Sequence, residues 1–324
     1  MTAVADRPAR ARRRQRVGAG RFGRVLTLWI IALLFLIPLV AFFASPARCQ
    51  TSNAAVGFSC THGITNSSGG FLGLGALSWD NLVYSWREVT GFNGGAFAHW
   101  MRQTLVVAGG GTVLAVLTAL PAGYAMARLR FRGRRTLLFL TLLTMVVPNT
   151  VLIIPLFLEV NYVGMLGSVW PVIVIMGFYP FGVYLSYISY MTTLPRELVE
   201  AARIDGLSEV GIFFRVAMPL AKGATAIIVF FSFVADWTNY FLPLVMFPDT
   251  GNSTISVGLQ TMIGTSNLYS PTSSGLQDRA GKTLQLFLPQ LTLAAVVSML
   301  PILFLFFVSQ RFLVRGQTMG AIKG

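Results

Sequence analysis

Long apolar stretches dominate the hydrophobic pattern of this chain. A helix that crosses a membrane needs about 20 mostly apolar residues, and six stretches of that length occur, with charged residues gathered between them. The pattern therefore predicts an all-α integral membrane protein with six transmembrane helices. The predicted spans are residues 25–45, 101–127, 136–158, 168–190, 224–247 and 286–309.

Composition supports this interpretation. The 324 residues are 54% hydrophobic and only 11% charged, whereas soluble domains carry about 25% charged residues. The span at 25–45 is longer than the apolar region of an ordinary signal peptide, and five more spans follow it. We therefore expect it to remain in the protein as a helix.

The basic residues predict the orientation. The formal net charge is +14, and twenty of the 25 Lys and Arg residues lie before the first span or after the second, fourth and sixth spans. Basic residues concentrate on cytoplasmic loops, so we expect both termini in the cytoplasm. The charge is explained by topology and contact with membrane lipid, and nucleic acid is not an expected partner.

The predicted topology divides the chain into five parts. A basic cytoplasmic tail (1–24) precedes the first span (25–45), a long extracytoplasmic loop (46–100) and a core (101–310), and a short cytoplasmic tail (311–324) follows. The core contains a cytoplasmic loop at about 191–223 and a second extracytoplasmic loop at about 248–285.

The two cysteines, Cys49 and Cys60, lie together in the first outer loop. The outside of the membrane is oxidising, so a disulfide is a candidate there, with two free thiols as the alternative. Cys and His residues do not occur at metal-ligand spacing, and we expect no metal site.

The cytoplasmic loop carries the most informative local pattern. Pro195 can open a helix over 196–205, Gly206 suits the turn that ends it, and Ser208 can cap a second helix over 208–217. Ala201 and Ala202 form a patch of small side chains, with charges around them that can pair. This arrangement is typical of a docking site for another protein rather than of a catalytic site.

The same loop carries a resemblance to a known family. Glu200-Ala201-Ala202, then Gly206 and Val216-Ala217-Met218-Pro219, resembles the EAA-x3-G-x9-I-x-L-P loop of ABC importer permeases. Val216 stands where Ile is usual and Met218 where Leu is usual, which are both conservative apolar changes.

Three further blocks resemble maltose-type sugar permeases. Residues 121–133 are similar to a P-A-A-Y-A-x-A-R…F-x-G block, with Gly123 in place of an Ala. Residues 237–244 are similar to W-N-x-F-x-x-P-L, with Thr238 and Tyr240 as departures. Residues 316–324 are similar to a G-x-T-x-G-A-x-K-G ending, which points to the sugar subfamily.

The resemblance implies a type I ABC importer permease fold and a non-catalytic subunit in the cytoplasmic membrane of a bacterium. It implies a second permease subunit, two ATP-binding subunits that use ATP and Mg, and an extracytoplasmic solute-binding protein or lipoprotein that delivers sugar. This chain itself is expected to bind no cofactor. The resemblance assigns ATPase docking through a coupling helix to Glu200, Ala201, Ala202 and Gly206, with Arg203 and Asp205 beside them.

One acidic residue falls at membrane depth. Asp236 lies beside Trp237, Asn239 and Tyr240 in the fifth predicted span. An ionisable group at this depth is a candidate functional site, and aromatic and hydrogen-bonding side chains suit a sugar path. The alternatives are that Asp236 pairs structurally with another subunit or that its side chain extends to the outer surface of the membrane.

Other functions compete with sugar import. The same importer class could carry a polyol or glycerol phosphate, although a phosphate path should show Arg or Lys within the membrane. An ATP-independent carrier should show inverted repeats and matched intramembrane acids, and Asp236 has no counterpart in sequence. A membrane-embedded enzyme should show converging His, Asp or Glu at membrane depth. Which sugar is carried is not predicted.

Overall fold

A computed structural model describes residues 18–47, 79–249, 253–266 and 288–318, together with Leu77 and Leu286. Cys49 and Cys60, most of both predicted outer loops and the last six residues of the C-terminal motif lie outside the described residues. Within the described part, regular structure is helical apart from an isolated bridge between Ser266 and Leu286 and a bridge position at Leu77. The predicted all-α class is confirmed.

The helices follow the order of the predicted spans with several interruptions. They are α1 (Gly18–Ala44), η1 (Ser45–Ala47), α2 (Trp79–Gly91), η4 (Phe92–Gly94), α3 (Ala96–Arg128), α4 (Arg134–Val146), α5 (Asn149–Tyr162), α6 (Val169–Met176), α7 (Pro180–Thr193), α8 (Arg196–Ile204), α9 (Glu209–Ile212), the π-helix η5 (Phe213–Ala217), α10 (Met218–Leu220), α11 (Lys222–Trp237), α12 (Phe241–Met246), α13 (Ile255–Gly264) and α14 (Leu288–Thr318).

Four segments are long and apolar enough to cross a membrane by themselves: Arg24–Ala47, Ala96–Arg128, Val169–Thr193 and Leu288–Phe312. Two further pairs of helical segments reach this length only if each bent pair is counted as one span. They are Arg134–Val146 with Asn149–Tyr162, and Glu209–Leu220 with Lys222–Trp237. The described residues therefore contain four to six candidate spans.

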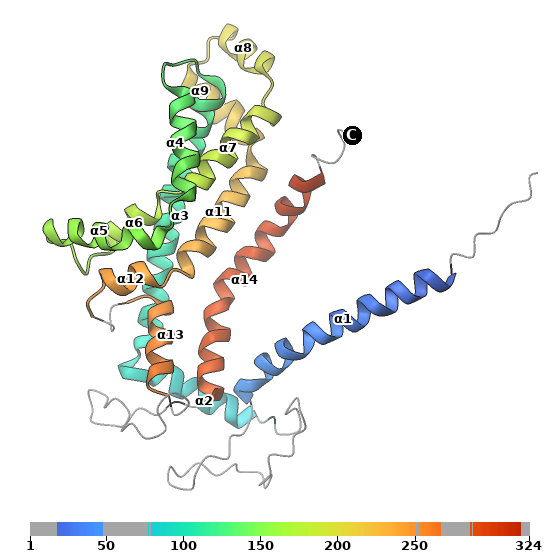
Figure 1. The fold of residues 1–324 in the computed structure, drawn as a ribbon, viewed down its shortest axis with the longest axis vertical. Coiled ribbons are helices and arrows are strands. Elements are labelled where there is room, and N and C mark those ends of the chain that lie inside the picture. Colours follow the sequence, from blue (N-terminus) through green and yellow to red (C-terminus); the bar gives the residue numbers. More distant parts are fainter. Residues whose placement is uncertain are drawn as a thin grey trace, which may run out of the picture.

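The prediction of one continuous helix over 136–158 is wrong. The chain turns by 100° between α4 and α5, and α5 projects sideways, away from the bundle (Figure 1). Pro148 explains the break, because proline disfavours a helical conformation at Val147, and Val147 is extended with ψ 122°. The 13 residues of α4 span about 20 Å, which is less than the hydrocarbon thickness of about 30 Å.

The predicted span at 224–247 is also interrupted. Helix α11 ends at Trp237, and α12 follows after a short turn in a different direction (Figure 1). At its N-terminal end, α11 meets Glu209–Leu220 at a bend of 80°. The helical part that remains straight is therefore Lys222–Trp237.

Helix α3 is the central element of the bundle, and α6, α7, α11 and α13 all pack against it. Small residues permit this close approach. A side chain at Gly123 would collide with the side chain of Ser186 on α7, and one at Gly110 would lie 3.0 Å from the Ile173 side chain on α6. The Ser186 hydroxyl donates a 2.7 Å hydrogen bond to the Ala119 carbonyl on α3, which ties α7 to this surface.

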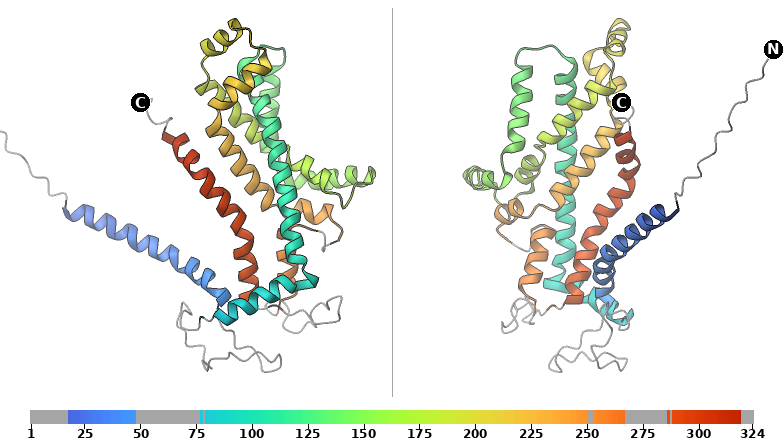
Figure 2. Two further views of the ribbon diagram at one scale, coloured as in Figure 1. Left: turned by 180° about the vertical axis from the view of Figure 1, so that it is seen from behind. Right: turned by 45° about the vertical axis from the view of Figure 1, so that its right-hand side comes forward.

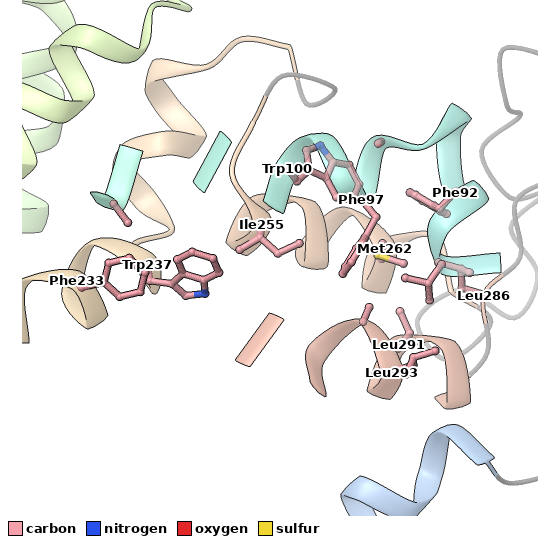
Figure 3. Close-up of a cluster of buried hydrophobic side chains, with 14 residues drawn as sticks. Phe92, Phe97, Trp100, Phe233, Trp237, Ile255, Met262, Leu286, Leu291 and Leu293 are labelled. Carbon is pink, nitrogen blue, oxygen red and sulfur yellow. The ribbon is translucent and has the colours of Figure 1, made fainter. Parts of the chain in front are cut away.

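Two buried clusters stabilise opposite ends of the bundle. At the end that holds α2 and α13, Trp100 and its neighbours from α3, α11, α13 and α14 form an aromatic and aliphatic core (Figure 3). At the other end, Tyr124, Tyr190, Ile212 and Phe213 pack together beneath α8 and α9.

Helix α1 stands apart from this bundle. It contacts η1 and α14 near its C-terminal end and diverges from the other helices along the rest of its length (Figure 2). None of the most apolar part of the segment Arg24–Ala47 is buried in this chain.

Replacing Gly123 with Ala should destabilise the bundle, because the new methyl group would overpack the contact between α3 and α7 by about 1–3 kcal/mol. Gly109→Ala is the matched control, since Gly109 lies in the same helix with no atom within 4 Å of an added Cβ. Thermal unfolding of the purified chain in detergent should show a lower midpoint only for Gly123→Ala. Equal midpoints would contradict the packing assigned to Gly123.

Candidate functional site

The loop that is predicted to be cytoplasmic folds as the predicted pair of short helices. Helix α8 begins at Arg196, one residue after Pro195, so that Pro195 precedes the helix instead of opening its first turn. Gly206 follows the helix with φ +79°, a left-handed conformation that favours glycine. The Leu207 amide donates a 3.1 Å hydrogen bond to the Ala202 carbonyl, which closes the end of α8.

The second predicted helix, 208–217, is formed by α9 and the π-helix η5. Ser208 caps it as predicted, because its hydroxyl oxygen accepts a 3.2 Å hydrogen bond from the Gly211 amide. Met218-Pro219 then starts α10, which leads into the bend before α11. The loop is therefore a rigid helical unit at one end of the bundle (Figure 1).

Helix α8 has an inner and an outer face. Val199 and Ala202 point inward and are 3% and 8% exposed. Glu200, Ala201 and Ile204 are exposed, and Ile204 is 87% accessible. The predicted patch of two alanines is thus divided: Ala201 faces outward, whereas Ala202 packs against its own subunit and leaves no surface for a partner.

A polar latch, formed by Tyr124, Arg203 and Glu209, holds this loop on α3. The Arg203 guanidinium Nε donates to Glu209 Oε1 at 2.6 Å, and the Tyr124 hydroxyl donates to Glu209 Oε2 at 3.2 Å. The hydrogen bond from Arg203 lowers the pKa of Glu209. The ion pair therefore stabilises the loop at pH values above the usual glutamate pKa, and this contribution is lost as the pH falls through the lowered pKa of Glu209.

Arg128, the last residue of α3, holds the C-terminal end of α7, which precedes α8 in the chain. Its guanidinium donates to the carbonyl of Tyr190 at 2.7 Å and to the carbonyl of Leu194. Tyr190 lies in the last turn of α7, where its carbonyl also accepts a 3.3 Å hydrogen bond from the Leu194 amide, and Leu194 directly follows the helix. Arg128 thereby fixes the place where the chain leaves α7 and enters α8.

Sequence reasoning did not identify Tyr124, Arg128 or Glu209 as site residues. Tyr124 and Arg128 are four residues apart and so share one face of α3. Both belong to the 121–133 block, and that spacing was the available signal. Their partners could not be found in this way, because Glu209 is 85 residues from Tyr124 in the sequence.

Asp236 lies on α11, where it faces α3. The residue is 8% exposed, and a side chain added at Gly111 would come within 2.6 Å of its Oδ2 atom. Among the described residues, the Oδ2 atom of Asp236 has no hydrogen-bond partner. The hydroxyl group of Thr112 on α3 has none either. Buried polar atoms normally have partners, so α3 and α11 enclose polar groups that are unsatisfied among the described residues.

The other three predicted path residues have different surroundings. Trp237 is 3% exposed and stacks on Phe233 with ring centroids 5.3 Å apart (Figure 3). Its indole N–H donates to the Ser298 carbonyl at 3.1 Å. Trp237 is a packing residue in this conformation, and its burial disfavours direct contact with a sugar.

Asn239 and Tyr240 lie in the turn between α11 and α12, and both are partly buried. The Asn239 side-chain oxygen accepts a 3.3 Å hydrogen bond from the Leu242 amide, which supports the start of α12. The Tyr240 ring lies edge-on to Phe241, with centroids 5.2 Å apart. Among the described residues, no group of three His, Cys, Asp or Glu side chains could hold a metal ion.

Comparison with known proteins shows the family to which this chain belongs. Residues 119–318 match the family described as binding-protein-dependent transport system inner membrane component. The chain belongs to this family. The match includes the latch, Asp236 and the α8–α10 loop, called the coupling loop below because it contains the predicted coupling helix.

Relatives with described names agree with this family assignment. The Bacillus subtilis protein named arabinooligosaccharides transport system permease protein AraQ is 27% identical over 94% of this chain and 96% of its own length. The Bacillus subtilis protein named maltodextrin transport system permease protein MdxG is 33% identical over 70% of this chain and 75% of its own. The predicted resemblance to ABC importer permeases is confirmed.

A solved structure supports the fold. A chain from the crystal structure of a bacterial ABC transporter involved in the import of the acidic polysaccharide alginate matches with a TM-score of 0.68. The match covers 90% of this chain and 95% of that chain at 21% identity. The type I ABC importer permease fold is therefore confirmed.

Replacing Tyr124 with Phe should loosen the coupling loop without unfolding the permease. Loss of one hydrogen bond to a charged group costs about 1.5–3 kcal/mol, and partial exposure should place this bond at the lower end. Hydrogen exchange of the α8–α9 amides should become roughly tenfold faster, with α11 unchanged. Tyr187→Phe is the control, because no hydrogen bond of its hydroxyl is seen among the described residues. Unchanged exchange in Tyr124→Phe would show that the latch does not hold the loop.

Proposed function

We propose that this permease imports a sugar across the cytoplasmic membrane of a bacterium by alternating access. The observation that carries this proposal is the rigid coupling loop with its exposed outer face, in a chain of this family. Relatives named for arabinooligosaccharide and maltodextrin transport support a mono-, di- or oligosaccharide as the substrate.

The outer face of α8 is the proposed docking surface for an ATP-binding subunit. Glu200, Ala201 and Ile204 face outward, and Asp205 and Gly206 are exposed at the end of the helix. The small Ala201 side chain permits close approach, while Ile204 offers apolar surface that would be buried on docking. Arg203 is occupied by Glu209, so its proposed role is to hold the loop.

The coupling loop can transmit force because both of its ends are fixed. Arg128 holds the end of α7, and Glu209 holds α9 on α3. ATP and Mg are proposed to bind the two partner subunits and not this chain. Closure of those subunits would move the coupling loop as a unit and shift the bundle between two packed states. ATP must favour one of these states to drive transport.

The proposed orientation has six spans and places both termini in the cytoplasm. The distribution of basic residues supports it, and the C-terminal part of α14 lies toward the end of the bundle that holds α8 (Figure 1). A second permease subunit is proposed to cover α1, whose apolar surface has few contacts in its own chain. An extracytoplasmic binding protein would deliver sugar at the opposite end.

Asp236 is proposed to line the translocation path. The unsatisfied Oδ2 atom and the Thr112 hydroxyl are the polar groups that a sugar hydroxyl would need once the helices separate. Their present burial between α3 and α11 corresponds to a closed path.

Replacing Gly206 with Leu should impair ATPase docking, because a left-handed conformation costs a non-glycine residue about 1–2 kcal/mol. The protein should remain in the membrane, while ATPase co-purification and sugar uptake fall. Gly133→Leu is the matched control, since Gly133 also has positive φ and open surroundings but lies before α4. Unchanged sugar uptake in Gly206→Leu would count against the docking role. A panel of sugars in binding-protein-stimulated ATP hydrolysis would identify the substrate.

Replacing Asp236 with Asn should reduce sugar uptake by about tenfold, which corresponds to the loss of one hydrogen bond of about 1.4 kcal/mol, while ATPase co-purification is retained. Ser232→Ala is the control, because the buried Ser232 hydroxyl is satisfied by the Ile228 carbonyl in the same helix. Uptake at the unaltered rate in Asp236→Asn would exclude Asp236 from the path.

A further inference from the structure

A basic cleft lies between the start of α4 and the start of α8. It has a volume of about 710 Å³, and five arginines line it. They are Arg128, Arg130, Arg134, Arg196 and Arg203. The carboxylates that line it are Glu200 and Glu209, and Glu209 is already paired with Arg203.

The five arginines outnumber the two carboxylates of the lining, and Glu197, which acts on Arg128 from outside the lining, offsets only part of the excess positive charge. Arg134 and Arg196 lie close enough to Arg128 to act on its guanidinium electrostatically. The Nε atom of Arg128 is buried and has no hydrogen-bond partner among the described residues. An anion in the cleft would relieve the repulsion between these guanidinium groups and accept hydrogen bonds from them.

The surface of α4, which begins at the cleft, is apolar. Helix α4 begins at Arg134 and has no buried residue along its length. Leu137, Phe139, Leu140 and Leu143 on this helix are 46–63% exposed. A charged cleft at the end of an exposed apolar helix fits a molecule with an anionic head and hydrocarbon chains, whereas a soluble anion would leave the apolar surface unused.

We propose that the cleft binds the phosphate headgroup of an anionic membrane lipid, with its acyl chains along α4. Basic pockets at the cytoplasmic ends of membrane helices favour such headgroups. Because Arg203 and Glu209 form part of the cleft wall, the lipid would lie directly beside the latch that orients the coupling loop. Lipid binding in the cleft does not depend on the proposed orientation of the chain. Only the assignment of the lipid to the cytoplasmic leaflet rests on that orientation.

The test is native mass spectrometry of the purified full-length chain with added phosphatidylglycerol or phosphatidylcholine. Phosphatidylglycerol should bind more tightly. The Arg130→Gln/Arg134→Gln double variant should weaken its binding by about fivefold for each arginine, or about 25-fold in all. Arg215→Gln/Arg311→Gln is the matched control, since it removes the same charge from exposed residues outside the cleft, and it should bind phosphatidylglycerol like the unaltered chain.

Two further arms identify the ligand. Excess inorganic phosphate should not displace phosphatidylglycerol; displacement would indicate a site for a free anion. A candidate ATP-binding subunit should bind together with the lipid; displacement by that subunit would assign the cleft to the protein partner. Equal binding of both lipids, or equal losses in the two double variants, would also overturn the proposal. The lipid measurement uses the chain without its partners, so its result is independent of whether ATPase docking or sugar uptake occurs.

Discussion

Close approach of three helices to α3 is the constraint on which the rest of the structure depends. Within a membrane, lipid tails are as apolar as the side chains, so the hydrophobic effect does not drive helices together. Van der Waals contact must do so, and it requires backbones to come near each other. Gly110 and Gly123 supply this contact to α6 and α7, and Gly111 makes room for the Asp236 carboxyl of α11. The glycines of α3 therefore act at distinct contacts: Gly110 and Gly111 are packed, whereas Gly109 has open space beside it.

The two ends of the bundle are stabilised by different kinds of contact. At the α13 end, Trp100 and Trp237 belong to a dense buried cluster, so this end of the described bundle is stabilised mainly by apolar contacts. At the other end, polar contacts are added to the apolar core: Arg128 binds carbonyls of α7, and Glu209 receives hydrogen bonds from two different elements. Such directional contacts fix the orientation of a surface loop more narrowly than apolar packing alone.

Much of the helical fold could be predicted from the sequence, because the length of apolar stretches is a strong local signal. The turn at Gly206 and the cap at Ser208 were also predictable, since each depends on residues within one helical turn. The break at Pro148 was not predicted, because apolar content continues on both sides of it and conceals the change of direction. The packing of Trp237 and Ala202 was missed for another reason: their partners, on α14 and in the core beneath α8, are distant in sequence. Cys49 and Cys60 lie outside the described residues, and their pairing stays a prediction.

The latch has a consequence for exchanging parts between related permeases. The coupling loop is contiguous in the chain, which makes it an obvious segment to transplant into a chimeric transporter. Its orientation, however, is set by Tyr124 and Arg128, which lie on α3 and would be left behind. A functional chimera must therefore also contain Tyr124 and Arg128. If only the contiguous loop is transferred, the contacts that orient it are lost.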